Sequence, residues 1–143
     1  MCTVWISWRE AVRIRSEGGR GPELSDNRRR KGALGEETAA QYLIGKGWRI
    51  IERNWRCRSG EVDIIAKKDG TLIFIEVRSR TGATHGTAAE SVTARKIAQV
   101  RHIAQIYLHM HGAADTPVRF DMIAVRLLPD QKAEVMEHIE AAF

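Results

Sequence analysis

The stretch GEVDIIAKKDGTLIFIEVRSR, residues 60–80, constrains the fold of this chain more than any other segment. Two runs rich in Ile, Val and Phe flank Asp69-Gly70, and an Asp-Gly pair between such runs predicts a β-hairpin with a tight turn. When Lys68 faces Thr71 across that turn, the facing partner of every other residue follows. The stretch therefore predicts two antiparallel strands in one register.

This register gives the hairpin an apolar side and an acidic side, because successive side chains of a strand point to opposite faces. The apolar side is expected to face the core. It consists of the facing pairs Val62 and Val77, Ile64 and Ile75, and Ala66 and Ile73.

On the acidic side, Asp63 faces Glu76 and Ile65 faces Phe74. Directly facing side chains have Cβ atoms about 4.5–5.5 Å apart, so two carboxylates there repel and cost up to about 1 kcal/mol. A hard divalent cation, which takes one or two carboxylates together with water, reverses that repulsion. A solvated face is the alternative, but Ile65 and Phe74 indicate that part of this side is covered and that the acids lie at the rim of a cleft.

The other elements follow from hydrophobic periodicity and turn residues. A first helix is expected over residues 34–47, ending at Gly47, and its inward stripe consists of Glu36, Ala39, Ala40 and Leu43. A strand is expected over 48–55, a long helix over 87–110 and a further strand over 117–128. The apolar face of the long helix consists of Ile97, Val100, Ile103, Ala104 and Tyr107. The last segment, 132–143, is compatible with a strand or a helix.

The chain divides into an N-terminal extension, 1–27, and one domain, 28–143. Residues 1–15 are compatible with a short basic helix or a flexible arm, and 16–27, rich in Gly, Ser, Pro and Asn, are expected as a linker. Residues 1–31 hold eight Lys/Arg and four Asp/Glu, against fifteen and fourteen in the remainder. Most of the net charge of +5 therefore belongs to residues 1–31 and says little about the rest of the chain.

The spacing of the cysteines and the hydropathy pattern indicate where in the cell the protein is expected. Cys2 and Cys57 lack the spacing of a zinc site. No apolar run reaches the 18 or so residues of a membrane helix. We expect a cytoplasmic protein without a membrane partner.

An acid on a helix, then Gly-Glu-x-Asp, a turn and Glu-x-basic together resemble the PD-(D/E)xK nuclease superfamily. Over roughly residues 28–143 the chain is similar to the uncharacterised bacterial YraN family. The residues that carry the resemblance are Gly35-Glu36, Arg53-Asn54-x-Arg56, Gly60-Glu61-Val62-Asp63, residues 74–80, Lys96 and Arg119-Phe120-Asp121. The resemblance implies an α/β, restriction-endonuclease-like fold with a central mixed sheet flanked by helices and an α-β-β-β-α-β core, as in archaeal Holliday junction resolvases.

The resemblance also implies roles for the acids. Asp63 and Glu76 match the metal-binding acids, and Glu36 matches the acid that resolvase-like members carry on their first helix. Glu61 is an alternative ligand or a partner of Arg78. The implied cofactor is Mg²⁺ or Mn²⁺, and its candidate ligands are Asp63, Glu76, the backbone carbonyl of Val77, Glu36 and Glu61.

Arg78 stands where the superfamily usually has lysine. Because arginine is effectively always protonated, it can orient water or stabilise phosphate charge but cannot act as a base. Lys96 compensates if it reaches the cleft, and is otherwise a solvated lysine at a helix edge. The candidate catalytic residues are Asp63, Glu76, Arg78 and Glu36, and the candidate nucleic-acid-binding residues are Arg53, Arg56, Arg58, Arg80 and Lys96.

Three functions remain open at this point. The first is a metal-dependent nuclease that hydrolyses DNA, branched or single-stranded. The second is a non-catalytic nucleic-acid-binding module with a degenerate site, and the third is an interaction protein whose acids are structural. A resolvase-like role calls for a two-fold dimer, although no feature specific to a dimer is visible. Asp121 is interpreted as the partner of an arginine rather than as a further site acid.

Overall fold

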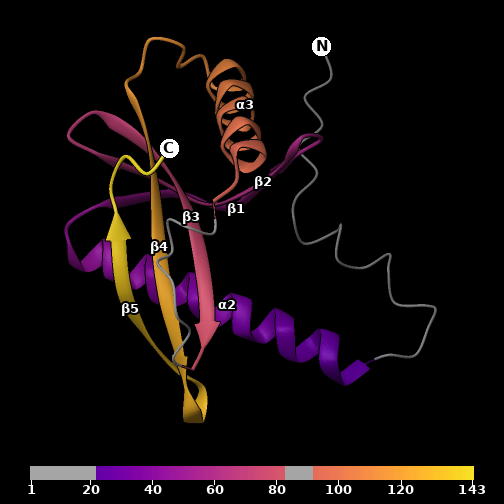
Figure 1. The fold of residues 1–143 in the computed structure, drawn as a ribbon. Coiled ribbons are helices and arrows are strands. Elements are labelled where there is room, and N and C mark those ends of the chain that lie inside the picture. The colour runs from indigo at the N-terminus through magenta and orange to yellow at the C-terminus, as the bar shows by residue number, and fades with distance from the viewer. Residues whose placement is uncertain (1–21, 83–91) are drawn as a thin grey trace.

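The computed structural model describes residues 22–82 and 92–143, which form an α/β fold with one five-stranded sheet (Figure 1). Its elements are α2 (Pro22–Gly45), β1 (Arg49–Cys57), β2 (Gly60–Lys68), β3 (Thr71–Thr81), α3 (Ala94–Met110), β4 (Val118–Leu128), the 3-10 helix η2 (Pro129–Gln131) and β5 (Lys132–Ile139). This order confirms the expected α-β-β-β-α-β core. No helix within these residues is both long enough and apolar enough to cross a membrane.

The sheet is mixed, as expected, and its strands lie in the order β1-β2-β3-β4-β5. Only β3 and β4 run parallel, and α3 supplies the crossover that a parallel pair requires. Between β2 and β3 the paired residues run from Lys68 and Thr71 to Ile64 and Ile75, which confirms the predicted register over that range. The last segment, which the sequence left open, forms the strand β5, antiparallel to β4.

Two hydrophobic clusters place α2 and α3 on opposite faces of the sheet, because the strand residues of the two clusters alternate along β2 and β3. The cluster under α2 includes Ala39, Ala40, Leu43, Ile64, Ala66, Ile73, Ile75, Ile123 and Val125. The cluster under α3 includes Val62, Ile65, Leu72, Phe74, Ile103, Ala104 and Tyr107. The inward stripes predicted for both helices are thus largely confirmed.

Val62 differs from its prediction. It was expected beside Ile64 on the face that α2 covers, but it packs in the cluster under α3. The ladder between β2 and β3 ends at Ile64 and Ile75, and beyond that pair β3 continues alongside β4. Because the two strands of the hairpin part there, the simple alternation of faces does not extend to Val62.

The helix boundaries differ from the sequence prediction at their starts. Helix α2 begins at Pro22, so residues 22–27, expected as linker, are helical. Residues 1–21 and the predicted helical residues 87–91 lie outside the described part of the chain. The end of α2 agrees with the prediction, because Gly47 has a φ of +81° and its N–H donates to the carbonyl of Ile44, while that of Trp48 donates to Leu43. This pattern is a Schellman motif.

Candidate metal and nucleic-acid site

Asp63 and Glu76 are the first residues of β2 and β3 beyond the end of their shared ladder. Both are buried, with exposed fractions of 9% and 8%, although carboxylates are rarely buried without a partner. Asp63 Oδ2 accepts a hydrogen bond of 2.8 Å from the backbone N–H of Val77. This bond ties the carboxylate of one strand to the backbone of the other where the ladder has ended.

Two cations contact Glu76 through the same oxygen, Oε1. Lys96 Nζ lies 3.1 Å away and Arg78 Nη2 lies 3.7 Å away. The Nε of Arg78 is buried and has no hydrogen-bond partner within residues 22–82 and 92–143. Lys96 therefore reaches the acids, and its contact with Glu76 is closer than that of Arg78.

The start of α3 fixes the position of Lys96. Thr93 is the N-cap of α3, and its side chain accepts a hydrogen bond of 3.2 Å from the N–H of Lys96. The carbonyl of Thr93 accepts a further bond from Ile97. Lys96 is thus held in the first turn of a capped helix, with its side chain 24% exposed.

Burial and neighbouring carboxylates perturb the pKa of Asp63. Burial and, next, the neighbouring carboxylate of Glu76 raise the pKa of Asp63 to about 7, against the lowering effect of the Val77 hydrogen bond. Glu36 and Glu61 raise it further. The raised pKa of Asp63 is therefore due first to burial and next to the neighbouring carboxylates.

Glu36 projects from α2 and is half-buried. Burial raises the pKa of Glu36, and a hydrogen bond with Asn54 opposes that rise. Asn54 has a φ of +53°, in the left-handed region that asparagine tolerates better than most residues. The sequence analysis did not identify this contact, although an asparagine inside a strand is a signal, because strands are depleted in it.

Glu61 pairs with a different residue from the one expected. Its Oε2 lies 2.7 Å from Arg56 Nε across the β1–β2 ladder, and no contact with Arg78 is present in the described residues. The expectation of a Glu61–Arg78 pair was wrong because Glu61 lies where β2 pairs with β1 rather than with β3.

The other basic candidates surround the acids unevenly. Arg53 Nη1 forms an ion pair of 2.6 Å with Glu37 of α2. Arg56 and Arg58 are exposed near the β1–β2 turn, and Arg80 is half-buried near the end of β3. The structure thus brings Lys96 into contact with the acids and leaves the four arginines as candidates for contact with a ligand.

The donor chemistry suits a hard divalent cation. Asp63 Oδ1 and Glu76 Oε2 have no recorded protein partner in the described part of the chain. Within that part no three His, Cys, Asp or Glu side chains form a ready metal cluster, so Glu36 and Glu61 do not complete one. Two carboxylates with a backbone carbonyl and water are typical of Mg²⁺ and unlike the four-ligand sites of structural zinc. The carbonyl of Val77 stays a predicted ligand.

Asp121 lies apart from these acids. It is fully buried and pairs with Arg119, with 2.8 Å between Arg119 Nε and Asp121 Oδ1. Its interpretation as the partner of an arginine is confirmed.

Comparison with known proteins identifies relatives of this chain. A family model described as "Uncharacterised protein family UPF0102" matches residues 35–125. A UPF0102 protein of Pelotomaculum thermopropionicum is 43% identical over 120 residues, which cover 84% of this chain and all of that protein. One of Moorella thermoacetica is 45% identical with the same coverage.

Two solved structures show a distant likeness. A structure titled as an EndoMS–dsDNA2 complex is 15% identical with a TM-score of 0.37, and the alignment covers 74% of this chain and 38% of that one. Pyrococcus furiosus SfsA in complex with Ca²⁺ is 13% identical with a TM-score of 0.37, and the alignment covers 79% of this chain and 64% of that one.

Proposed function

The chain belongs to the uncharacterised protein family UPF0102, the YraN family of the sequence resemblance, and from the buried pair Asp63 and Glu76 we propose that it is a metal-dependent nuclease that hydrolyses phosphodiester bonds in DNA. The single observation that carries this proposal is the placement of these acids. The two carboxylates lie close together and are buried, and each has an oxygen without a protein partner among the described residues.

The proposed cofactor is Mg²⁺ or Mn²⁺, held by Asp63, Glu76 and the carbonyl of Val77. When bound, such an ion lowers the pKa of a coordinated water and offsets charge that develops on the scissile phosphate. Asp63 and Glu76 orient the ion between the ends of the β2 and β3 ladder. Glu36 orients water from the side of α2.

The two cations on Glu76 have separate proposed roles. Lys96 stands in place of the lysine that position 78 lacks, and its ammonium donates to a non-bridging oxygen of the scissile phosphate. Arg78, on β3, binds the phosphate more weakly. Arg53, Arg56, Arg58 and Arg80 contact neighbouring phosphates, which position the strand without reading its sequence.

One observation favours a second candidate, a non-catalytic nucleic-acid-binding module. Arg78 occupies the usual lysine position, and its contact with Glu76, at 3.7 Å, is longer than that of Lys96, at 3.1 Å. For such a module, binding weakens steeply with salt and no cleavage occurs in any metal.

Cleavage assays decide between these candidates. Labelled single-stranded, duplex, flapped and four-way DNA is incubated with the protein in Mg²⁺, Mn²⁺ or EDTA, with Asp63→Asn and Glu76→Gln alongside. Asp115→Asn, which removes an exposed acid after α3, is the matched control. We expect cleavage that requires metal and both acids and is unchanged in the control. Cleavage that persists in Asp63→Asn would exclude this site.

Thermal unfolding provides a readout without activity. A ligand that binds only the folded state stabilises it, by about 2.7 kcal/mol at a concentration 100 times its Kd. We expect Mg²⁺ to raise the melting temperature of the wild type and of Asp115→Asn, but not that of Asp63→Asn. An equal rise in all three proteins would mean that the metal binds elsewhere.

A further inference from the structure

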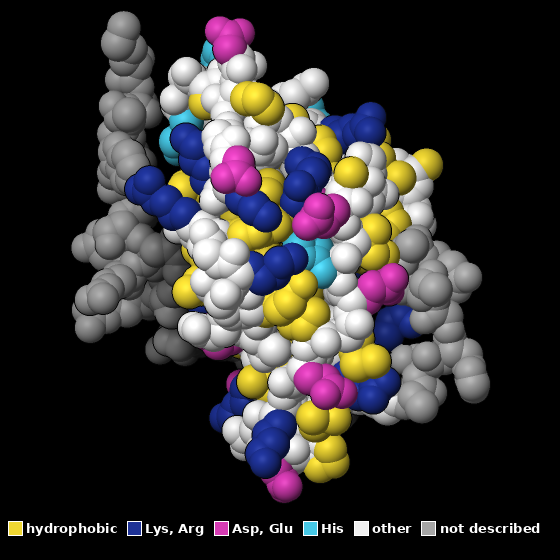
Figure 2. Space-filling model, turned by 90° about the vertical axis from the view of Figure 1, so that its left-hand side faces the viewer, with side chains coloured by type: hydrophobic (Ala, Val, Ile, Leu, Met, Phe, Trp, Pro, Cys, Tyr) yellow, Lys and Arg dark blue, Asp and Glu magenta, His cyan; other side chains and the backbone are white. Residues whose placement is uncertain are grey.

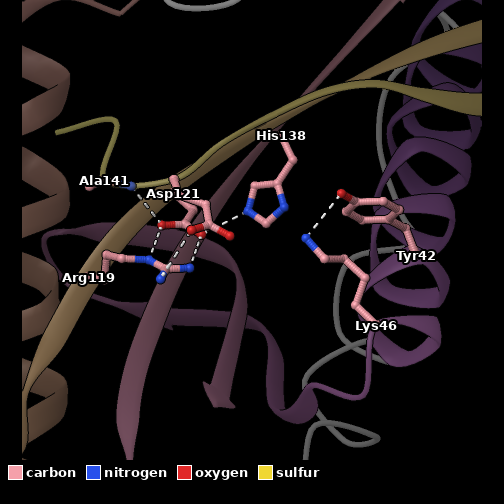
Figure 3. Close-up of polar contacts among 7 residues, drawn as sticks. Tyr42, Lys46, Arg119, Asp121, His138 and Ala141 are labelled. Carbon is pink, nitrogen blue, oxygen red and sulfur yellow. Dashed lines mark hydrogen bonds and ion pairs between the residues drawn. The ribbon is translucent and has the colours of Figure 1, made fainter. Parts of the chain in front are cut away.

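A second group of polar residues lies around Asp121, on the α2 face of the sheet. Asp121 aligns with Ile75 in the parallel pairing of β3 and β4, and Ile75 packs under α2. Both oxygens of Asp121 are used, by Arg119 at 2.8 Å, by the Nε2 of His138 at 2.8 Å and by the N–H of Ala141 at 3.1 Å (Figure 3). Glu76, the neighbour of Ile75, points to the opposite face.

Two buried nitrogens beside this group have no partner. The Nδ1 of His138 and the Nε1 of Trp48 make no hydrogen bond within the described residues, although the side chain of His138 is 4% exposed and Trp48 is 3% exposed. A buried polar atom without a partner costs about 1–3 kcal/mol. Figure 3 shows the ring of His138 between Asp121 on one side and Lys46 and Tyr42 on the other, with its second nitrogen turned toward Lys46 and Tyr42.

Three cations converge on Trp48. Lys46 Nζ lies 5.4 Å, Lys68 Nζ 5.3 Å and Arg119 Cζ 5.3 Å from its ring centroid. Arg119 is engaged by Asp121 and Glu140. Lys46 and Lys68 have no carboxylate partner in the described residues, and Lys46 donates only to the hydroxyl of Tyr42, at 3.4 Å. Like charges gathered in this way repel unless an anion lies among them.

The surface at this position is accessible. Lys46 and Lys68 are exposed, and Arg119 is partly exposed. Figure 2 shows the side of the molecule where α2 and β5 end in Figure 1, and Lys and Arg side chains there lie around hydrophobic and histidine side chains, with Asp and Glu side chains among them.

We infer that Lys46, Lys68 and Arg119, with Trp48 and His138, form a second anion site that takes a backbone phosphate of the nucleic acid. Ammonium groups and a guanidinium are the side chains that bind phosphate in proteins. The indole Nε1–H is a donor only, and Nδ1 of His138 becomes a donor when the ring is protonated. The identity of the ligand as nucleic acid rests on the proposed function, whereas the affinity for an oxyanion rests on this cluster alone.

The position of the site sets the length of substrate that it requires. Lys68 follows Asp63 by five residues on β2, about 16 Å at about 3.3 Å per residue. At about 3.4 Å per nucleotide along a duplex, one substrate must extend at least about five nucleotides past the cut to reach both sites, because the sites lie on opposite faces of the sheet. Shorter substrates contact only the site formed by Asp63 and Glu76.

The salt dependence of DNA binding tests this site directly. We expect the double variant Lys46→Ala/Lys68→Ala to reduce the magnitude of the slope of log K against log salt by about 0.9, since the site holds one phosphate and each phosphate contact contributes about 0.9. Arg101→Ala/Lys132→Ala removes two exposed cations elsewhere and is the control, in which the slope is expected to stay unchanged. An unchanged slope in the first variant would overturn the inference.

Nitrogen NMR signals of His138 and Trp48 separate the possible sources of phosphate. Shifts of both signals on addition of DNA longer than about five nucleotides, absent in the double variant, support the inference. Shifts with inorganic phosphate but none with DNA would overturn the proposed contact with a DNA backbone phosphate. They would indicate a site for small phosphates instead. Wild-type protein that shows these DNA shifts but never cleaves DNA would refute the nuclease and keep the anion site.

Discussion

At the residue scale, the two cations that contact Glu76 differ in their distance from it. Lys96 is closer to Oε1 than Arg78, and the Nε of Arg78 has no partner in the described residues. The sequence alone predicted the Asp63–Glu76 pair, because an Asp-Gly turn fixes the local register. It could not decide whether Lys96 reaches the pair, since that depends on where α3 starts and on how α3 packs against the sheet.

Substitution of the two cations tests their relative importance. We expect Lys96→Ala to lower kcat/KM for cleavage by about 100-fold or more, as loss of one well-placed donor costs about 10²–10³ in rate. Arg78→Ala is expected to lower it by less than about 10-fold. Arg95→Ala, an exposed neighbour on α3, controls for the loss of charge. A greater loss in Arg78→Ala than in Lys96→Ala would contradict the assignment.

The pH dependence of stability tests the network around Asp121. Burial alone would raise the pKa of Asp121, but hydrogen bonds from His138, Arg119 and Ala141 outweigh it, and the net effect is a lowered pKa. A carboxyl group with a lowered pKa in the folded state stabilises the protein above its unfolded pKa of about 3.9. This stabilisation decreases as the pH falls through the unfolded and then the folded pKa.

We therefore expect Asp121→Asn to lower the free energy of unfolding at pH 7 by about 3 kcal/mol, because Arg119 and His138 lose their charged partner. The difference between variant and wild type is expected to shrink as the pH falls below about 4. Urea unfolding across a pH series measures both effects. A difference that stays constant down to pH 2 would show that packing, not charge, is responsible.

At the element scale, two glycines allow the helices to pack closely against the strands that carry the candidate site. A Cβ on Gly35 would lie 1.8 Å from Ser79 Oγ, so glycine lets α2 approach β3 one residue before Glu36. Gly60 has a φ of +137°, and a Cβ there would lie 2.6 Å from Gln99 Nε2 and 3.1 Å from Ile103 Cδ1. Gln99 also donates to the carbonyl of Ser59, so the β1–β2 turn is tied to α3.

Alanine at Gly60 tests this contact. We expect Gly60→Ala to destabilise the protein by about 2–3 kcal/mol, through backbone strain and through displacement of α3. Gly70→Ala is the matched control, because Gly70 also has a positive φ, +78°, but nothing lies within 4 Å of its added Cβ. It is expected to cost about 1 kcal/mol, from strain alone. Equal losses in both variants, measured by urea unfolding, would exclude a role for the contact with α3.

The errors of the sequence analysis at this scale have one physical origin. Hairpin register and helix stripes depend on residues close in the chain, and they were predicted. The face of Val62 and the partner of Glu61 depend on where the ladder between β2 and β3 ends while β2 remains paired with β1. The start of α2 at Pro22 was not predicted, because residues 22–27 lack the apolar stripe by which hydrophobic periodicity identifies a helix.

At the scale of the whole molecule, the two faces of the sheet separate two groups of charges. Glu76 lies toward α3, where Lys96 contacts it, and the cations around Trp48 lie toward α2. Net charge could not reveal this arrangement, because residues 32–143 are almost neutral in sum. Only the fold brings Lys46, which follows α2, together with residues of β2 and β4 at Trp48.

The crossover between β3 and β4 also has a consequence for biosynthesis. Asp63 and Glu76 belong to one local hairpin, whereas Lys96 joins them only through α3, which lies between the two parallel strands. A nascent chain that has left the ribosome only as far as β3 carries both acids without their lysine. Under the proposed nuclease function, the set of Asp63, Glu76 and Lys96 is therefore completed late in translation, and truncated chains that end before α3 lack Lys96.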